Sequence, residues 1–169
     1  FLEKSGPWEL LSRLDNVSMK TLTPGEAVVL NERIQVRPIA IPHRGEYTET
    51  VGFIVRGPHR SVLYMPDIDK WERWGTRIED VIAQVDRAYV DGTFFADGEI
   101  PGRSMAEIPH PFVVESIHRL SALPAAERDK VHFTHLNHTN PLLQPGSAAS
   151  TQVREAGMHV AQEGERFGL

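Results

Sequence analysis

The segment Val131-His132-Phe133-Thr134-His135-Leu136-Asn137-His138-Thr139-Asn140-Pro141 decides the fold that we expect for this chain. Val131 and Phe133 supply the apolar face of a short strand, and His135 falls where that strand stops. Asn140 precedes a proline, which keeps the chain extended or in a turn as it leaves. An isolated strand histidine is more often packed or exposed than a ligand. Three histidines crowd this segment, however, which favours a metal or catalytic role for at least one of them.

Composition bounds the class of protein. The 169 residues have the length of one domain, and a hydrophobic content of 40% is enough for a core. A net charge of -5 makes a nucleic-acid partner unfavourable. The absence of cysteine excludes disulfides and thiolate zinc sites, so a metal would have to be held by His, Asp or Glu.

The sequence also bears on location. It has no run of about 18 apolar residues that could span a bilayer, and residues 1–25 lack the basic-then-apolar pattern of a signal peptide. We therefore expect a soluble, cytoplasmic protein without a membrane partner. Because the chain begins at Phe1 rather than at a methionine, we also expect it to be a fragment.

Hydrophobic periodicity predicts a strand-rich first part followed by alternating strands and helices, which is a mixed α/β (α+β) fold class. Helices are expected over residues 5–14, 77–85, 112–120 and 148–156, with a helical turn at 124–129. Strands are expected over residues 26–30, 34–41, 50–56, 61–65, 88–90 and 158–162 and from residue 131, the first two forming a hairpin. Trp8, Leu11 and Leu14 share one face of the first helix, which we expect to pack. Residues 96–109 are interpreted as a long loop.

Five ionisable residues follow predicted strands or begin a predicted helix: His43, Asp67, Asp91, His110 and His135. Such groups can converge on one edge of a sheet, and their oxygen and nitrogen donors suit Zn, Mn or Fe. A shared aspartate can bridge two metal ions about 3.5 to 4 Å apart. Two alternatives stay open. Asp67 could cap a helical turn over 70–74, and His110 could hydrogen-bond locally at its helix terminus.

Four segments carry a resemblance to a known family: "IPHRGEYTETVGFIVRGPHRSVLYMPDIDKW" (41–71), "YVDGTFF" (89–95), "IPHPFVVESIHRL" (108–120) and "HFTHLNHTNP" (132–141). Together they resemble the C-terminal half of a metallo-β-lactamase-fold hydrolase, in the branch of the pyrroloquinoline quinone (PQQ) biosynthesis B proteins, PqqB. The resemblance implies an αββα sandwich, with residues 1–169 as the C-terminal part of a single domain. The HxHxDH-type segment of that family, which supplies most ligands of the first metal, is absent from the chain and would lie upstream.

The resemblance also implies roles for single residues. His43, Asp67 and His135 match metal ligands of the family. Asp91 and His110 resemble the catalytic strand-end acid and helix-start histidine of its phosphodiesterase and tRNA 3′-processing branch. His138 and Asp69 are expected to be extra ligands or groups that support the ligands. Arg44 and Asn140 are expected to bind substrate, although Arg44 could equally form a surface salt bridge.

These matches imply a metal-dependent hydrolase that uses metal-activated water on an ester, a phosphodiester or a cofactor precursor. The expected cofactor is a divalent metal, Zn with Mn or Fe as alternatives, and two ions in the full-length parent. We expect a small-molecule substrate and a possible homodimer. Two alternatives remain: a non-catalytic carrier or binding protein in PQQ-type cofactor biosynthesis, and a complete metal-free α/β domain.

Overall fold

The structure is a computed structural model that describes residues 2–46 and 48–169. Its helical elements are η1 (Leu2–Lys4), α1 (Gly6–Arg13), η2 (Trp71–Arg73), α2 (Ile78–Ile82), α3 (Val113–Leu120), α4 (Ala125–Arg128), η3 (Pro141–Leu143) and α5 (Ala148–Glu155). Its strands are β1 (Val28–Val29), β2 (Gln35–Ala40), β3 (Val51–Arg56), β4 (Ser61–Met65), β5 (Arg87–Asp91), β6 (Val131–Thr134) and β7 (His159–Val160). Within these residues, every helix is too short or too polar to cross a membrane.

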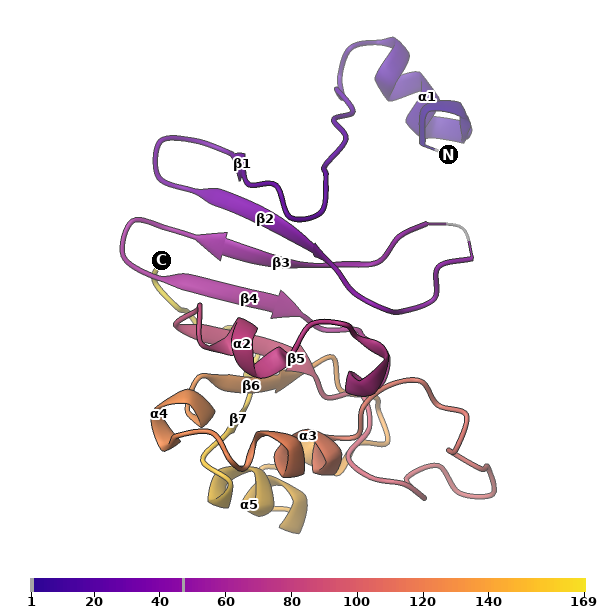
Figure 1. The fold of residues 1–169 in the computed structure, drawn as a ribbon. Coiled ribbons are helices and arrows are strands. Elements are labelled where there is room, and N and C mark those ends of the chain that lie inside the picture. Colours follow the sequence, from indigo (N-terminus) through magenta and orange to yellow (C-terminus); the bar gives the residue numbers. More distant parts are fainter. Residues whose placement is uncertain (1, 47) are drawn as a thin grey trace.

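The strands form one seven-stranded sheet in the order of the sequence, β1 to β7 (Figure 1). Strands β1 to β4 pair antiparallel, whereas β4 to β7 pair parallel. Strands β2, β4, β5 and β6 consequently run in the same direction. Because parallel strands end at the same side, their carboxyl ends meet at one edge of the sheet.

One face of the sheet forms the core. A row of paired residues crosses it, with Ile54 opposite Leu63, Leu63 opposite Ala88, and Ala88 opposite Val131. All four are at most 1% exposed and pack with apolar residues of α2, α3 and α5 in one cluster. The helices therefore cover this face, and alternation of side chains along each strand turns the next residues to the other face.

The opposite face carries the row formed by Phe53, Tyr64, Tyr89 and His132. Tyr64 in this row is 49% exposed, so in the described part of the chain this face is only partly covered. A sheet covered by helices on one face and partly open on the other has the form of one half of a sandwich. The mixed α/β class expected from the sequence is confirmed.

The predicted elements form, with differences in detail. Helix α2 is shorter than expected, β1 and β7 have only two residues each, and η1 and η3 are additional helical turns. Residues 96–109 contain no helix or strand, but Met105 and Ile108 anchor this loop in a small apolar cluster with Phe94 and Phe112.

The expectation that α1 packs through its apolar face is wrong for the described residues. Helix α1 has no buried residue, and Trp8 and Leu14 are 53% and 59% exposed. Figure 1 shows why: the helix stands away from the sheet at the end of a long connecting segment. Periodicity predicts that a helix has an apolar face, but it does not say what lies against that face.

Candidate functional site

The predicted site residues lie at the carboxyl edge of the sheet. Asp91 is the last residue of β5, and His135 directly follows β6. His43 and Asp67 follow β2 and β4 by a few residues. The start of α3 is fastened to this edge from two sides, because Lys70 N donates to Pro109 O (2.6 Å) and Val113 N donates to Phe94 O (2.9 Å). These bonds hold His110 beside the strand ends.

Asp91 is the buried centre of the site, with no exposed surface. Its Oδ2 accepts hydrogen bonds from Ile68 N (3.0 Å) and from His110 Nδ1 (2.8 Å). Its Oδ1 accepts from the backbone N and the hydroxyl of Thr93, at 2.8 and 2.7 Å. Four donors thus surround one carboxylate, which is the arrangement that compensates for burying a negative charge.

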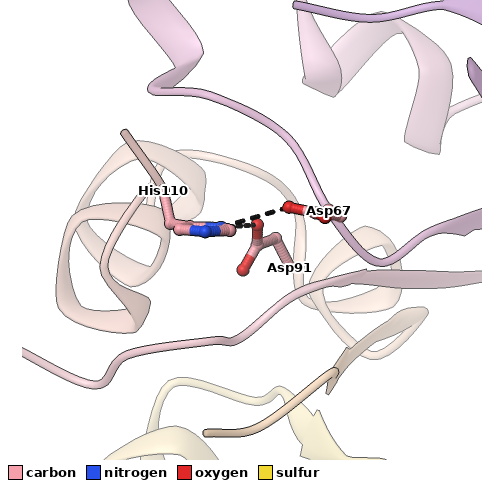
Figure 2. Close-up of side chains that lie close together, drawn as sticks. All are labelled: Asp67, Asp91 and His110. Carbon is pink, nitrogen blue, oxygen red and sulfur yellow. Dashed lines mark hydrogen bonds and ion pairs between the residues drawn. The ribbon is translucent and has the colours of Figure 1, made fainter. Parts of the chain in front are cut away.

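The Nδ1 side of the His110 ring faces two carboxylates, as Figure 2 shows. Its Nδ1 is 2.8 Å from Asp91 Oδ2 and 3.4 Å from Asp67 Oδ1. Burial by itself lowers the pKa of His110, but the hydrogen bond to Asp91 and the negative charges of Asp91, Asp67 and Asp69 raise it above its ordinary value. His110 therefore keeps its proton to higher pH than a free histidine, and Asp91 holds that proton on the Nδ1 side of the ring.

Asp67 carries the feature that points most directly to a cation. Its Oδ1 is buried and has no hydrogen-bond partner in the structure, although His43 Nε2 lies 3.1 Å away and His110 Nδ1 lies 3.4 Å away. An unpaired buried carboxylate oxygen is costly unless a proton or cation satisfies it. Asp67, Asp91 and His110 also offer one ligand atom each within 4.8 Å of one another. This donor set suits a divalent metal ion.

His43 also contacts a second carboxylate, through the ring nitrogen that does not face Asp67. Its Nδ1 lies 3.1 Å from Asp69 Oδ1, and Asp69 Oδ2 accepts from Arg73 Nη1 at 2.9 Å. If Nδ1 donates to Asp69, the lone pair of His43 is on Nε2, the nitrogen that faces Asp67. A carboxylate behind the imidazole is the usual arrangement around a histidine that binds a metal.

His135 is brought to the same edge from β6. Its side chain is exposed, its ring centre lies 6.4 Å from that of His110, and its Nδ1 lies 3.0 Å from Thr93 Oγ1. Its backbone has a φ of 60°, which is uncommon for a residue other than glycine. The five residues predicted to converge therefore do lie together.

Of three further predicted residues, Asn140 lies differently from what was expected, whereas the roles of Arg44 and His138 stay predictions. Asn140 is only 2% exposed, its Nδ2 donates to Gly92 O (2.7 Å), and its Oδ1 accepts from Leu142 N (2.9 Å). Both the nitrogen and the oxygen of its side-chain amide thus bond inside the protein, so the expected contact of Asn140 with substrate is replaced by a structural role. Arg44 is exposed beside His43. His138 is exposed on the loop after β6. The side-chain hydrogen bonds of this loop are formed by the neighbouring residues Asn137 and Thr139.

Asp67 does not cap a helix in the structure. The short helix η2 begins after Lys70, and no side chain caps it. Thr93 belongs to the strand end that resembles the family, but the sequence alone predicted no role for it. It is 8% exposed, and its hydroxyl touches Asp91, His110 and His135. The sequence signal for Thr93 is its position two residues after Asp91 in the segment "VDGT".

Comparisons with known proteins show the family and the fold of the chain. The sequence pattern of the Beta-lactamase superfamily domain matches residues 2–136. Coenzyme PQQ synthesis protein B of Methylobacterium nodulans is 31% identical over 137 residues, covering 76% of this chain and 44% of that protein. The protein of the same name from Methylobacterium radiotolerans is 32% identical over 134 residues, covering 74% of this chain and 43% of that protein. The chain spans less than half the length of these two curated relatives.

A solved structure shows the same fold. The crystal structure of Zn(2+)-bound PqqB from Methylobacterium extorquens matches with a TM-score of 0.72 at 19% identity, covering 95% of this chain and 62% of that chain. The resemblance inferred from the four sequence segments is thereby confirmed. The chain belongs to the β-lactamase superfamily, and its fold is the metallo-β-lactamase fold of PqqB-like proteins.

Proposed function

We propose that the protein of which this chain is part is a metal-dependent hydrolase. Its substrate would be a small molecule with an ester or phosphodiester bond, or a cofactor precursor. The observation that carries the proposal is the buried Asp67 Oδ1, which accepts no hydrogen bond among the described residues and faces His43 Nε2 at 3.1 Å, beside the hydrogen-bonded pair of Asp91 and His110. A cation would satisfy Asp67 Oδ1, and the pair of Asp91 and His110 would supply a positioned proton. Zinc is the metal we expect, because the PqqB structure from M. extorquens is zinc-bound.

We divide the site residues into metal ligands and a proton donor. We assign His43, Asp67 and His135 to holding a divalent ion, which in hydrolases activates water and polarises the bond under attack. His110 would assist the leaving group: Asp91 holds Nδ1 at 2.8 Å, which leaves Nε2 to deliver a proton to the departing oxygen. Asp69 would keep the ring of His43 oriented through the 3.1 Å contact at Nδ1.

The test is Asp67→Ala in the full protein. Bound zinc is measured by elemental analysis after dialysis, and hydrolysis is measured with bis(p-nitrophenyl) phosphate and p-nitrophenyl acetate. We expect the variant to lose most of its zinc and its turnover, because the carboxylate that faces both histidines is gone. The matched control is Asp129→Ala, since Asp129 also contacts a histidine, His159 at 2.8 Å, but lies away from the site. Unchanged zinc content in Asp67→Ala would overturn the ligand role.

A second candidate function is a carrier or binding protein in cofactor biosynthesis. It is favoured by one observation, namely that the curated relatives are called synthesis proteins. A carrier would bind zinc without turning over any substrate of the panel. In that case His110→Gln would change neither zinc content nor any measured rate. A measurable rate that falls in His110→Gln would favour the hydrolase instead.

A further inference from the structure

Thr93 lies where two histidines of the site meet one carboxylate. Its Oγ1 is 2.7 Å from Asp91 Oδ1, 3.0 Å from His135 Nδ1 and 3.3 Å from His110 Nδ1. The residue is 8% exposed, so its hydroxyl is not free to exchange these partners for water. A buried hydroxyl with one proton and several partners must divide donor and acceptor roles among them.

The direction of each hydrogen bond follows from what the partners can do. Both oxygens of Asp91 are surrounded by donors, among them the backbone N–H groups of Ile68 and Thr93, so Asp91 accepts throughout. The single hydroxyl proton of Thr93 therefore goes to Asp91. The hydroxyl oxygen can then only accept from His135, which places a proton on Nδ1 of His135 and the lone pair on Nε2.

We propose that Thr93 is a positioning residue that selects this tautomer of His135 and orients its ring, so that Nε2 is presented to a divalent cation. The inference rests on the proposed function, because it takes His135 as a ligand. It extends that proposal by naming the group that prepares the ligand, since the other ring nitrogen of a metal-binding histidine needs a hydrogen-bond acceptor.

The backbone around Thr93 is built to keep this contact. Gly92 N donates to Thr134 O (2.9 Å), and Asn137 N donates to Thr93 O (3.0 Å), on the two sides of His135. A side chain at Gly92 would meet Phe133 Cβ at 2.9 Å and Thr134 O at 3.0 Å, so only glycine lets the ends of β5 and β6 approach this closely. The exposed His135, with its φ of 60°, is thereby held at a fixed place relative to Thr93.

The experiment compares Thr93→Val with Thr93→Ser in the full protein. Valine keeps the shape and removes the hydroxyl, whereas serine restores it. Affinity for Zn²⁺ is measured by competition with a chromophoric chelator. The tautomer of His135 is read from ¹⁵N chemical shifts of its ring in the metal-free protein. We expect Thr93→Val to bind Zn²⁺ about 10- to 100-fold more weakly and to lose the single Nδ1–H tautomer, and Thr93→Ser to restore both.

Thr139→Val is the matched control, because its hydroxyl also bridges two side chains near the site, Asn137 and Glu99, without touching a histidine. Unchanged Zn²⁺ affinity and an unchanged His135 tautomer in Thr93→Val would overturn the proposal. An equal loss of affinity in Thr139→Val would overturn it as well, because the effect would then be one of general loop packing.

The two proposals fail separately. If Asp67→Ala loses zinc while Thr93→Val behaves like the parent, only the role of Thr93 is wrong. If Asp67→Ala keeps its zinc while Thr93→Val changes the His135 tautomer, Thr93 positions His135 as argued and the proposed metal site is wrong.

Discussion

His110 and His132 are two poorly exposed histidines with opposite electrostatic environments. The His110 side chain is 15% exposed and His132 is 7% exposed. His110 faces Asp91 and Asp67 at the carboxyl edge of the sheet, and its pKa lies above the ordinary value. His132 lies in the middle of β6, and its pKa is lowered to about 4 by burial, then by the charge of Arg87 and by His159.

The difference shows that burial alone does not determine the direction in which the pKa of a histidine shifts. Burial lowers the pKa of both residues, and only the carboxylates beside His110 reverse the effect. His132 stacks on His159, with ring centres 4.7 Å apart, and its buried Nδ1 has no hydrogen-bond partner among the residues that the structure describes. We therefore interpret His132 as a packing residue and His110 as a residue whose protonated form is favoured by the carboxylates beside it.

The largest expected effect is on turnover. His110→Gln removes the proton donor and leaves the carboxylate face of the site in place. We expect the rate of hydrolysis to fall about 100- to 10,000-fold, with zinc content unchanged, as measured by steady-state kinetics and elemental analysis on the same preparation. His118→Gln, on the exposed face of α3, is the control. Loss of zinc in His110→Gln would mean that His110 is a ligand, together with Asp67 and Asp91.

The next effect concerns stability in acid. The pKa of His132 is about 4 in the folded protein and about 6.5 when unperturbed, so between these values the unfolded state binds the proton more tightly. Stability from this group is complete above pH 6.5 and is lost as the pH falls towards 4, by up to about 3 kcal/mol. We expect His132→Phe to lack this loss, as measured by urea unfolding of parent and variant at several pH values.

Parallel loss of stability in the parent and in His132→Phe between pH 6.5 and 4 would contradict this environment for His132. At pH 7 the variant should be about as stable as the parent, because phenylalanine replaces an imidazole whose buried Nδ1 is unpaired.

The smallest effect compares two aspartate–histidine pairs. Asp69 contacts His43 at 3.1 Å within the site, and Asp129 contacts His159 at 2.8 Å on the surface. We expect Asp69→Ala to weaken Zn²⁺ binding about 10- to 100-fold, measured by chelator competition. Asp129→Ala should leave binding unchanged and cost at most about 1 kcal/mol of stability, because exposed ion pairs contribute little. Equal Zn²⁺ affinities in the two variants would remove the supporting role of Asp69.

Much of the fold could be predicted because local pattern and final position agree. The short apolar runs of β3 and β4, bounded by turn residues, predicted both strands within a residue of their observed bounds. The site residues could be predicted as a group because each follows a strand or begins a helix, and parallel strands bring their ends to one edge. Asn140 was misjudged because its amide looks free in the sequence, whereas it bonds to residues 47 and 48 positions away.

By itself, the sequence determined the order of strands and helices, the superfamily and the set of ionisable residues at the strand ends. These follow from side-chain periodicity and from residue type, which are local properties of the chain. Only the tertiary structure decided which histidine has a carboxylate neighbour, that Asp69 lies behind His43, and that Thr93 joins Asp91 to His135. Those contacts join residues up to 42 positions apart, and hydrogen bonds and charges act over distances in space rather than along the chain.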